Sequence, residues 1–273
     1  MRFMQLTDTH IREEYSADGI DALLGQRLSP AENLKNLLKR ADWKDIDFMV
    51  ITGDLVHEGI TEDYLYLNQI IKENVPEQMK VLYVLGNHDH KEAFYCGIFE
   101  QEKAEAYYYT STVQGYRLIV LDSAIPGKES GTVSKEQLDW LKQTLSEPSE
   151  KGSIVFLHHP VFWNTGGMSM ELTNGGEVLE ALAGSDVFAI FCGHTHANAV
   201  QQRDGITQYT ADSMAFSIEV HKGILSFTDK AGYLIADVKE NTAQVHFETV
   251  REDRPVIEFP ADVFARQLAS MDE

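Results

Sequence analysis

Cysteine, basic residues and long apolar runs are all scarce in this chain of 273 residues. Its two cysteines, Cys96 and Cys192, are too few for a disulfide framework, and no CxxC pair suggests a zinc or redox motif. No apolar run approaches the roughly 20 residues that span a bilayer. The residues before Asp8 lack a signal-peptide pattern. We therefore expect a cytoplasmic protein with no membrane partner.

Positive charge is also in short supply. Acidic residues outnumber basic ones by 43 to 23, which gives a formal charge of −20. Binding to nucleic acid depends on clustered Lys and Arg that displace counterions from the phosphate backbone. We therefore expect no long nucleic acid as a partner. A small anionic substrate stays compatible with this charge, because bound metal ions can reverse the local field.

The chain lacks internal repeats, low-complexity stretches and a Pro/Ser-rich linker, so we expect residues 1–273 to form a single domain. Up to residue 204, apolar runs of strand length alternate with segments of helical period, which is typical of an α/β fold. We expect residues 205–273 to add a second, more antiparallel sheet and a C-terminal segment. The helical spacing of that segment, Phe259 to Glu273, leaves docking on a second copy and hence a homo-oligomer open.

Local patterns predict individual elements. Six runs rich in Val, Ile and Phe predict strands that are buried on both faces: 3–6, 48–51, 81–85, 118–121, 154–157 and 187–191. Capping boxes at Ser29 and Ser134 each predict the start of a helix. Apolar stripes at 64–71 and 178–182 predict two more helices.

Five clusters of metal-ligating residue types stand where predicted strands end. They are Asp8-Thr9-His10, Gly53-Asp54, Gly86-Asn87-His88-Asp89, His158-His159 and Gly193-His194-Thr195-His196. Ligands of α/β sheets bind outside the carboxyl ends of the strands, so we expect all five clusters at one edge. Asp8 and His10 are two residues apart, as are His194 and His196, and in an extended chain such pairs point to the same side. Glycine before a cluster permits a sharp turn and a close backbone approach.

The residue types narrow the ion. Carboxylate, imidazole and amide donors without thiolate suit Mn, Fe, Zn or Co. The donors are too many for one ion, and two divalent ions that share one carboxylate fit better. Seven of the ten histidines fall in or beside the clusters, so chance placement is a poor explanation. His57, His221 and His246 lie outside the pattern, and we expect ordinary core or surface positions for them.

In this order, the motifs resemble the signature of the calcineurin-like metallophosphoesterases. The closer likeness is to the branch with cyclic-nucleotide and glycerophosphodiester phosphodiesterases. The resemblance spans residues 8–196 and implies a four-layer α/β/β/α sandwich of two mixed sheets flanked by helices. It implies two metal positions that share Asp54, one formed by Asp8, His10 and His196 and one formed by Asn87, His158 and His194. It also implies that His88 faces the substrate phosphate as an acid or charge stabiliser.

Residues and resemblance together predict a dinuclear metal-dependent phosphodiesterase for small diesters, such as 3′,5′-cyclic nucleotides or glycerophosphodiesters. A metal-bound hydroxide would attack phosphorus. His88 would help to expel the leaving group, and Asp89 would orient it. We expect Asn87, His88 and His159 to contact the substrate. The alternatives are a phosphomonoesterase for a small phosphorylated metabolite and a non-catalytic binding protein.

Some assignments stay open. His159 could also stand behind a ligand, and the role of His90 is undecided. Asp122 either supports a ligand or holds a turn. Residues 211–216 depart from the Pro-Ser-Thr stretch that relatives often carry, and Val161 replaces a second proline. Both segments are expected to line the substrate side, so substrate identity is the least certain inference.

Overall fold

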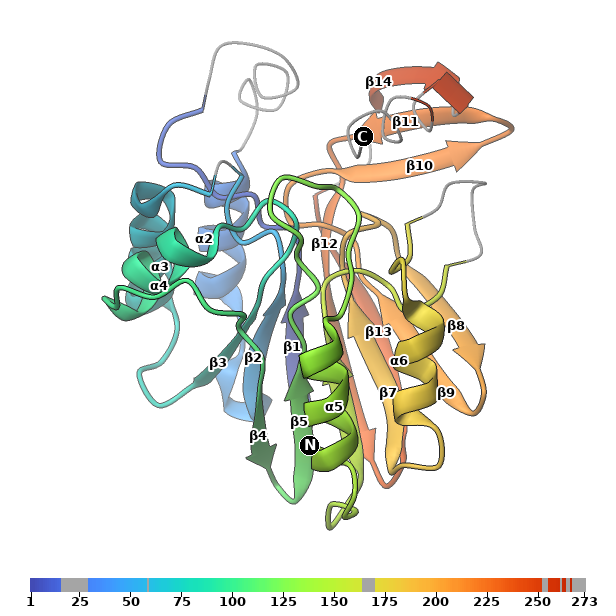
Figure 1. Cartoon of the computed structure of the whole chain (residues 1–273). Coiled ribbons are helices and arrows are strands. Elements are labelled where there is room, and N and C mark those ends of the chain that lie inside the picture. The colour runs from blue at the N-terminus through green and yellow to red at the C-terminus, as the bar shows by residue number, and fades with distance from the viewer. Residues whose placement is uncertain are drawn as a thin grey trace.

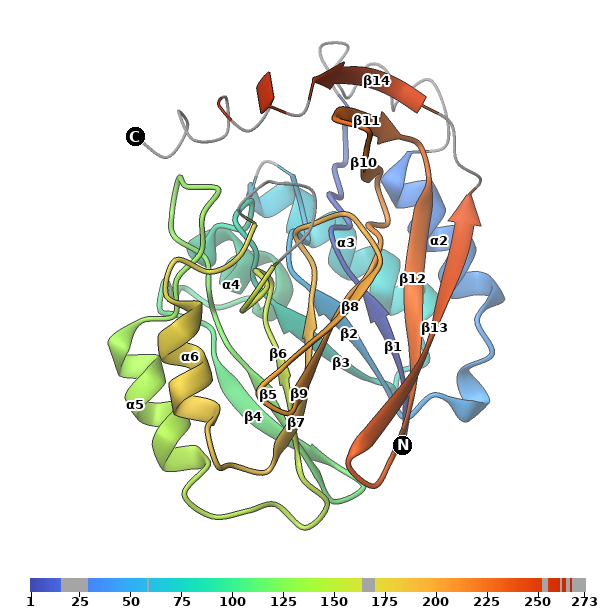
Figure 2. The same cartoon turned by 90° about the vertical axis from the view of Figure 1, so that its right-hand side faces the viewer.

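The computed structural model describes residues 1–15, 29–57, 59–163, 170–251, 255–260, 262–263 and 266. Two sheets face each other, and helices cover the outer face of each (Figure 1). Figure 2, turned by 90°, shows α5 and α6 on one outer side and α2 and α3 on the other. The predicted four-layer α/β/β/α sandwich is confirmed.

The first sheet has the strand order β13-β12-β1-β2-β3. Its strands are β1 (Arg2–Leu6), β2 (Phe48–Thr52), β3 (Lys80–Val84), β12 (Ala231–Lys239) and β13 (Thr242–Arg251). Strands β1, β2 and β3 run parallel, whereas β12 pairs antiparallel with β1. The carboxyl ends of the three parallel strands therefore lie at one edge.

The second sheet has the strand order β4-β5-β6-β7-β9-β8. Its strands are β4 (Tyr109–Val113), β5 (Tyr116–Val120), β6 (Ser153–Phe156), β7 (Val187–Cys192), β8 (Ala199–Arg203) and β9 (Ile206–Thr210). Strands β5, β6, β7 and β9 run parallel. All six strands predicted from apolar runs are confirmed within one or two residues.

The expectation that residues 205–273 form the second sheet is wrong. Strand β9 joins the second sheet, while β12 and β13 extend the first. Without β12, strand β1 would be an open edge, and Leu234 of β12 also packs between the two sheets. A third, small sheet consists of β10 (Ser217–His221), β11 (Ile224–Thr228) and β14 (Pro255–Pro260). Most residues from Phe259 to Glu273, and with them the predicted docking of this segment, lie outside the described residues.

The helices follow the predicted capping. Helices α2 (Pro30–Arg40) and α5 (Lys135–Thr144) begin after Ser29 and Ser134, whose side chains accept backbone N–H bonds. Helices α3 (Thr61–Asn74) and α6 (Gly175–Leu182) are also confirmed. Helix α4 (Lys91–Phe99) and a 3-10 turn (Trp43–Asp45) were not predicted. Among the described residues, no helix has the length and apolar character needed to cross a membrane.

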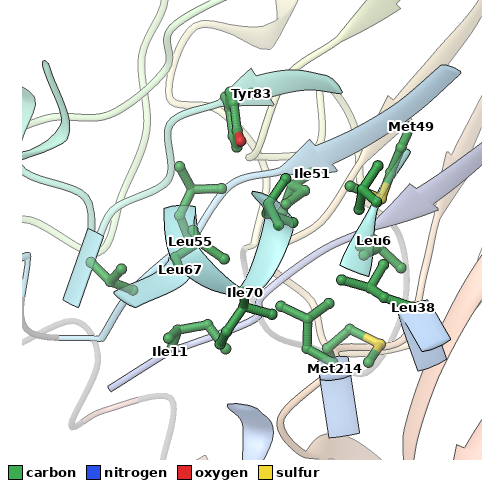
Figure 3. Close-up of a cluster of buried hydrophobic side chains, with 14 of the residues drawn as sticks. Leu6, Ile11, Leu38, Met49, Ile51, Leu55, Leu67, Ile70, Tyr83 and Met214 are labelled. Carbon is green, nitrogen blue, oxygen red and sulfur yellow. The ribbon is translucent and has the colours of Figure 1, made fainter. Parts of the chain in front are cut away.

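Three apolar layers hold the sandwich together. One lies between the sheets and includes Phe3, Phe156 and Phe191. A second lies between α5, α6 and the second sheet. The third lies between α2, α3, α4 and the first sheet, where Leu6, Met49 and Ile51 meet helix residues such as Leu38 and Ile70 (Figure 3). Because the central strands β1, β2, β6 and β7 are buried on both faces, the loops at their carboxyl ends rest on a rigid base.

Candidate metal centre

The loops after β1, β2, β3, β6 and β7 meet at one edge, as predicted. Backbone bonds tie them together: Asp8 N donates to the Gly53 carbonyl at 3.0 Å, and Gly193 N donates to the His158 carbonyl at 2.9 Å. Across the two sheets, His194 N donates to Asp8 Oδ2 at 3.0 Å, so loops from both sheets form one cluster. Two groups of donor atoms lie within it.

The first group consists of Asp8, His10, Asp54 and His196, and we call the space between their ligand atoms the first position. The Nε2 atom of His196 lies 3.2 Å from Asp8 Oδ1 and 3.3 Å from His10 Nε2. His10 Nε2 lies 3.7 Å from Asp54 Oδ2. All four side chains are buried, and their ligand atoms lie within 4.8 Å of one another.

The second group, here the second position, contains Asn87, His158 and His194. The Oδ1 atom of Asn87 lies 3.0 Å from His158 Nε2 and 3.1 Å from His194 Nδ1. His158 Nε2 also lies 3.4 Å from Asp54 Oδ2. The carboxylate of Asp54 thus stands between the two positions.

Hydrogen bonds behind the ligands turn their lone pairs toward these positions. The Nδ1 atom of His196 donates to the Phe216 carbonyl at 2.7 Å. His158 Nδ1 donates in the same way to the Thr52 carbonyl at 2.8 Å. With Nδ1 as the donor, each ring presents an unprotonated Nε2 when it is neutral. Asn87 donates a hydrogen bond from Nδ2 to the carboxylate of Glu129. Its Oδ1 acceptor therefore faces the lone pair on His158 Nε2.

Acceptors that face each other fit a cation between them. Metal–ligand bonds of about 2.0–2.2 Å place neighbouring ligand atoms roughly 3–3.5 Å apart. The observed separations run from 3.0 Å for Asn87 and His158 to 3.7 Å for His10 and Asp54. The residues present therefore fit two divalent cations.

In the absence of cations, the pKa values of these side chains show that the Asp54 carboxylate attracts positive charge. Burial lowers the pKa of His158, but the Asp54 carboxylate outweighs burial and raises that pKa to about 10. Burial raises the pKa of Asp54, yet the charges of His158 and His88 hold it well below its usual value. Burial also lowers the pKa of His10 and of His194 well below 6.5. Those two rings stay neutral and keep a lone pair available.

Five of the ligand candidates have left-handed backbone conformations: φ is 49° at Asp8, 42° at His10, 48° at Asp54, 68° at His194 and 49° at His196. Each such residue costs about 1–3 kcal/mol and persists where its surroundings require it. The expectation that an extended chain aligns these pairs is therefore wrong. Asp8 and His10 do meet at the first position, but His194 and His196 face different positions.

The glycines before the clusters allow close packing, as predicted. A Cβ at Gly53 would lie 2.7 Å from the Cβ of His158. A Cβ at Gly86 would lie 2.9 Å from the carboxyl carbon of Asp54, and one at Gly193 would lie 2.6 Å from Asp8 Oδ2. Since real Cβ atoms do not approach this closely, each glycine is required for the observed ligand geometry.

His88 lies beside the shared Asp54, and its ring centroid is 4.9 Å from that of His10. Its backbone N–H donates to Asp54 Oδ1 at 3.0 Å, and its ring Nδ1 donates to the His57 carbonyl at 2.9 Å. Burial lowers the pKa of His88, but the charge of Asp54 outweighs burial and the pKa is raised. Because Nδ1 is engaged, a transferable proton would sit on Nε2.

Asp89 does not orient His88 as expected. Its Oδ2 accepts from the backbone N–H groups of Gly86 (2.8 Å) and Leu55 (3.2 Å), and its Oδ1 accepts from the Tyr64 hydroxyl (2.7 Å). These bonds join the loops after β2 and β3 to α3. Asp89 therefore braces the loop, and the His57 carbonyl orients His88.

His159 uses both of its ring nitrogens in hydrogen bonds within the protein. Its ring nitrogens lie near those of His158 and His194. However, Nδ1 accepts from the Ser123 hydroxyl at 2.8 Å, and Nε2 donates to the Glu129 carbonyl at 3.0 Å. The side chain is fully buried, and burial lowers its pKa to about 3. Both nitrogens are thus engaged, and the expected substrate contact of His159 is not supported.

The two residues with open roles lie outside both positions. His90 is exposed and precedes α4. Asp122 is buried, accepts from the backbone N–H of Tyr107 and of Ala124, each at 3.0 Å, and pairs with Lys91 at 3.2 Å. Asp122 therefore holds its loop rather than a metal ligand.

Two residues beside the first position escaped the sequence analysis. The Nδ1 atom of His57 lies 3.0 Å from the Nδ1 atom of His10, which contradicts the ordinary position expected for His57. The ring of Phe216 lies 4.3 Å from the ring of His196. Such neighbours fix the orientation of a ligand ring. A single histidine and a single loop phenylalanine form no recognisable motif. The one signal in the sequence was that residues 211–216, which include Phe216, differ from the stretch that relatives often carry.

Comparisons with known proteins agree with this geometry. Residues 1–198 match the family described as calcineurin-like phosphoesterase. A protein of Rhodococcus erythropolis named "Probable cyclic nucleotide phosphodiesterase" is 30% identical over 223 residues, which cover 80% of this chain and 72% of that protein. A protein of Arcobacter nitrofigilis named as a probable glycerophosphodiester phosphodiesterase is 31% identical over 231 residues and covers 80% of each chain.

Solved structures share the fold. A dimetal phosphatase from Danio rerio superposes with a TM-score of 0.66 at 14% identity, over 93% of this chain and 98% of that one. The family match covers residues 1–198 and hence the motifs from Asp8 to His196. The chain belongs to the calcineurin-like phosphoesterase family and is a phosphoester hydrolase.

Proposed function

We propose that this protein is a dinuclear metal-dependent phosphodiesterase that hydrolyses small phosphodiesters. One observation carries the proposal: the Asp54 carboxylate lies between two donor groups. Its Oδ2 is 3.7 Å from His10 Nε2 and 3.4 Å from His158 Nε2. A carboxylate in this place can bridge two cations about 3.5–4 Å apart, as two-metal hydrolysis needs.

The proposed ligands follow the two positions. One ion takes Asp8, His10 and His196, the other takes Asn87, His158 and His194, and Asp54 is shared. Mn, Fe or Zn fits this donor set. Bound ions would supply Lewis-acid activation of water and charge for the phosphate oxygens. Two carboxylates offset only part of four positive charges, so the site attracts anions although the chain is acidic.

His88 is proposed as the proton donor. Its Nδ1 is held by the His57 carbonyl at 2.9 Å, which fixes the ring plane. The negative charge of Asp54 favours its protonated form. An imidazolium beside the phosphate can stabilise charge and pass a proton to the departing alkoxide.

The preference for diesters rests on relatives. The similar proteins from Rhodococcus and Arcobacter are named for cyclic nucleotides and for glycerophosphodiesters, so both substrate classes are candidates. The charge of −20 favours a small substrate over a long nucleic acid.

We also propose that residues 1–273 form one domain, since β12 from the late part of the chain completes the first sheet. The exposed free thiol of Cys96 suits a reducing compartment such as the cytoplasm.

Hydrolysis assays with Mn²⁺-reconstituted protein test the proposal. Bis-p-nitrophenyl phosphate should be cleaved with a higher kcat/KM than the monoester, and 3′,5′-cyclic nucleotides and glycerophosphodiesters should be cleaved among natural compounds. The variant Asn87→Ala should lose orders of magnitude in kcat and keep its circular dichroism spectrum. Asn241→Ala, at the exposed turn after β12, is the matched control.

The outcomes separate the alternatives. Preference for the monoester would make the protein a phosphomonoesterase. A protein that holds two ions but cleaves neither ester would be a binding protein. Near-normal activity of Asn87→Ala would show that Asn87 is not a metal ligand.

A further inference from the structure

An acidic residue lies beside the second position. Glu129, in the loop between β5 and α5, accepts a hydrogen bond from Asn87 Nδ2 at 3.0 Å. Its side chain is partly exposed. It therefore adds a negative charge next to a site that must bind an anion.

The loop that carries Glu129 is firmly anchored. His159 donates from Nε2 to the Glu129 carbonyl at 3.0 Å and accepts at Nδ1 from Ser123 at 2.8 Å. The His159 ring also packs against Gly131, where a Cβ would overlap it. Since His159 is fully buried, its bonds fix the backbone of Glu129 relative to the metal ligands.

The carboxylate also fixes which atom of Asn87 faces the metal. An asparagine amide presents either an oxygen acceptor or a nitrogen donor, and only the oxygen can bind a cation. An ionised carboxylate accepts and does not donate, so Glu129 pairs with Nδ2. This pairing turns Oδ1 toward His158 and His194.

The charge has a separate consequence for the substrate. Glu129 is one hydrogen bond from a ligand of the second position, so a phosphate on the ions would lie roughly 5–8 Å from it, where a unit charge still acts. A phosphodiester carries one negative charge, whereas a monoester carries nearly two above its second pKa of about 6. We propose that Glu129 is a specificity-determining residue that disfavours dianionic monoesters and so favours diesters. This inference rests on the proposed phosphodiesterase function.

Two substitutions separate charge from positioning. Glu129→Gln removes the charge but keeps an oxygen acceptor for Asn87. Glu129→Ala removes both. Glu147→Gln is the control of equal charge change, because Glu147 is exposed and lies between α5 and β6, away from the carboxyl edge.

The expected result concerns the ratio of kcat/KM for bis-p-nitrophenyl phosphate to that for the monoester, with Mn²⁺ at about pH 8. Glu129→Gln should lower this ratio roughly two- to fourfold, which is the effect of one unit charge at this distance in a water-like dielectric. Glu147→Gln should leave the ratio unchanged. Glu129→Ala should also bind the second Mn²⁺ more weakly than Glu129→Gln in a calorimetric titration.

A binding measurement without turnover gives a second readout. Inorganic phosphate, titrated into the Mn²⁺-loaded protein, should bind several-fold more tightly to Glu129→Gln than to wild type. If the wild type prefers diesters and neither the ratio nor the phosphate affinity changes in Glu129→Gln, this inference is overturned and the proposed function stands. A wild type that cleaves neither ester overturns the proposed function and this inference together.

Discussion

Gly193 directly precedes the proposed ligand His194, and its replacement by alanine probes how tightly the candidate metal centre is packed. A Cβ there would overlap the Thr7 hydroxyl and lie 2.6 Å from Asp8 Oδ2 and 2.9 Å from the Thr52 carbonyl. Thr7 cannot simply rotate away, because its hydroxyl donates to Asp8 at 2.5 Å and contacts Thr52 at 3.1 Å in a fully buried setting. Overpacking of this kind costs about 1–3 kcal/mol. A lost hydrogen bond adds about 1 kcal/mol.

We therefore expect Gly193→Ala to lower the free energy of unfolding of the metal-free protein by about 2–4 kcal/mol in urea titrations. It should also weaken Mn²⁺ binding, since Asp8 must shift. Two controls isolate the cause. At Gly176, in α6, a Cβ meets nothing within 4 Å, so alanine should be neutral or stabilising by up to about 1 kcal/mol.

The second control tests backbone strain alone. Gly205 has a φ of +83° and nothing within 4 Å of an added Cβ. Alanine there should cost about 1 kcal/mol and leave Mn²⁺ affinity unchanged. If Gly193→Ala matched the wild type in both stability and Mn²⁺ affinity, the close packing described for this edge would be wrong.

Two other perturbations test the network behind the ligands. Tyr64→Phe removes the hydroxyl that donates to the buried Asp89 carboxylate at 2.7 Å, so urea unfolding should show a loss of about 1–3 kcal/mol. The half-buried Tyr233→Phe should change stability by less than about 0.5 kcal/mol, and an equal effect of both would contradict the role of Asp89. Burial lowers the pKa of His159 to about 3, so the unfolded chain binds its proton first as pH falls below the usual value near 6.5. The metal-free wild type should therefore lose about 2 kcal/mol between about pH 7 and 5 through this residue. His159→Gln should remove that part of the slope, and identical slopes would refute the assignment.

The residues that meet at the candidate metal centre could be predicted from sequence because their pattern is local. A strand that ends in Gly-Asp or Gly-His-x-His places donors at a sheet edge whatever the remaining fold. The capping boxes at Ser29 and Ser134 were equally local, and both helices begin there.

Long-range relations could not be found in this way. Strand β12 pairs with β1 across more than 200 residues, and the order of strands along the chain favoured a separate late sheet instead. His57 reaches His10 because Val56 forms a β-bridge with Ile11, a contact that no sequence pattern reveals. Asp8 and His10 have a left-handed backbone and not the extended one from which their alignment was predicted. Their side chains nevertheless meet at the first position.

The central claim is that Asp54 joins two cations held by loops of both sheets. A crystal structure of the Mn²⁺-loaded protein with anomalous diffraction tests it directly. We expect two anomalous peaks about 3.5–4 Å apart, each within bonding distance of an Asp54 oxygen. A single peak, or two peaks that Asp54 does not bridge, would contradict the account.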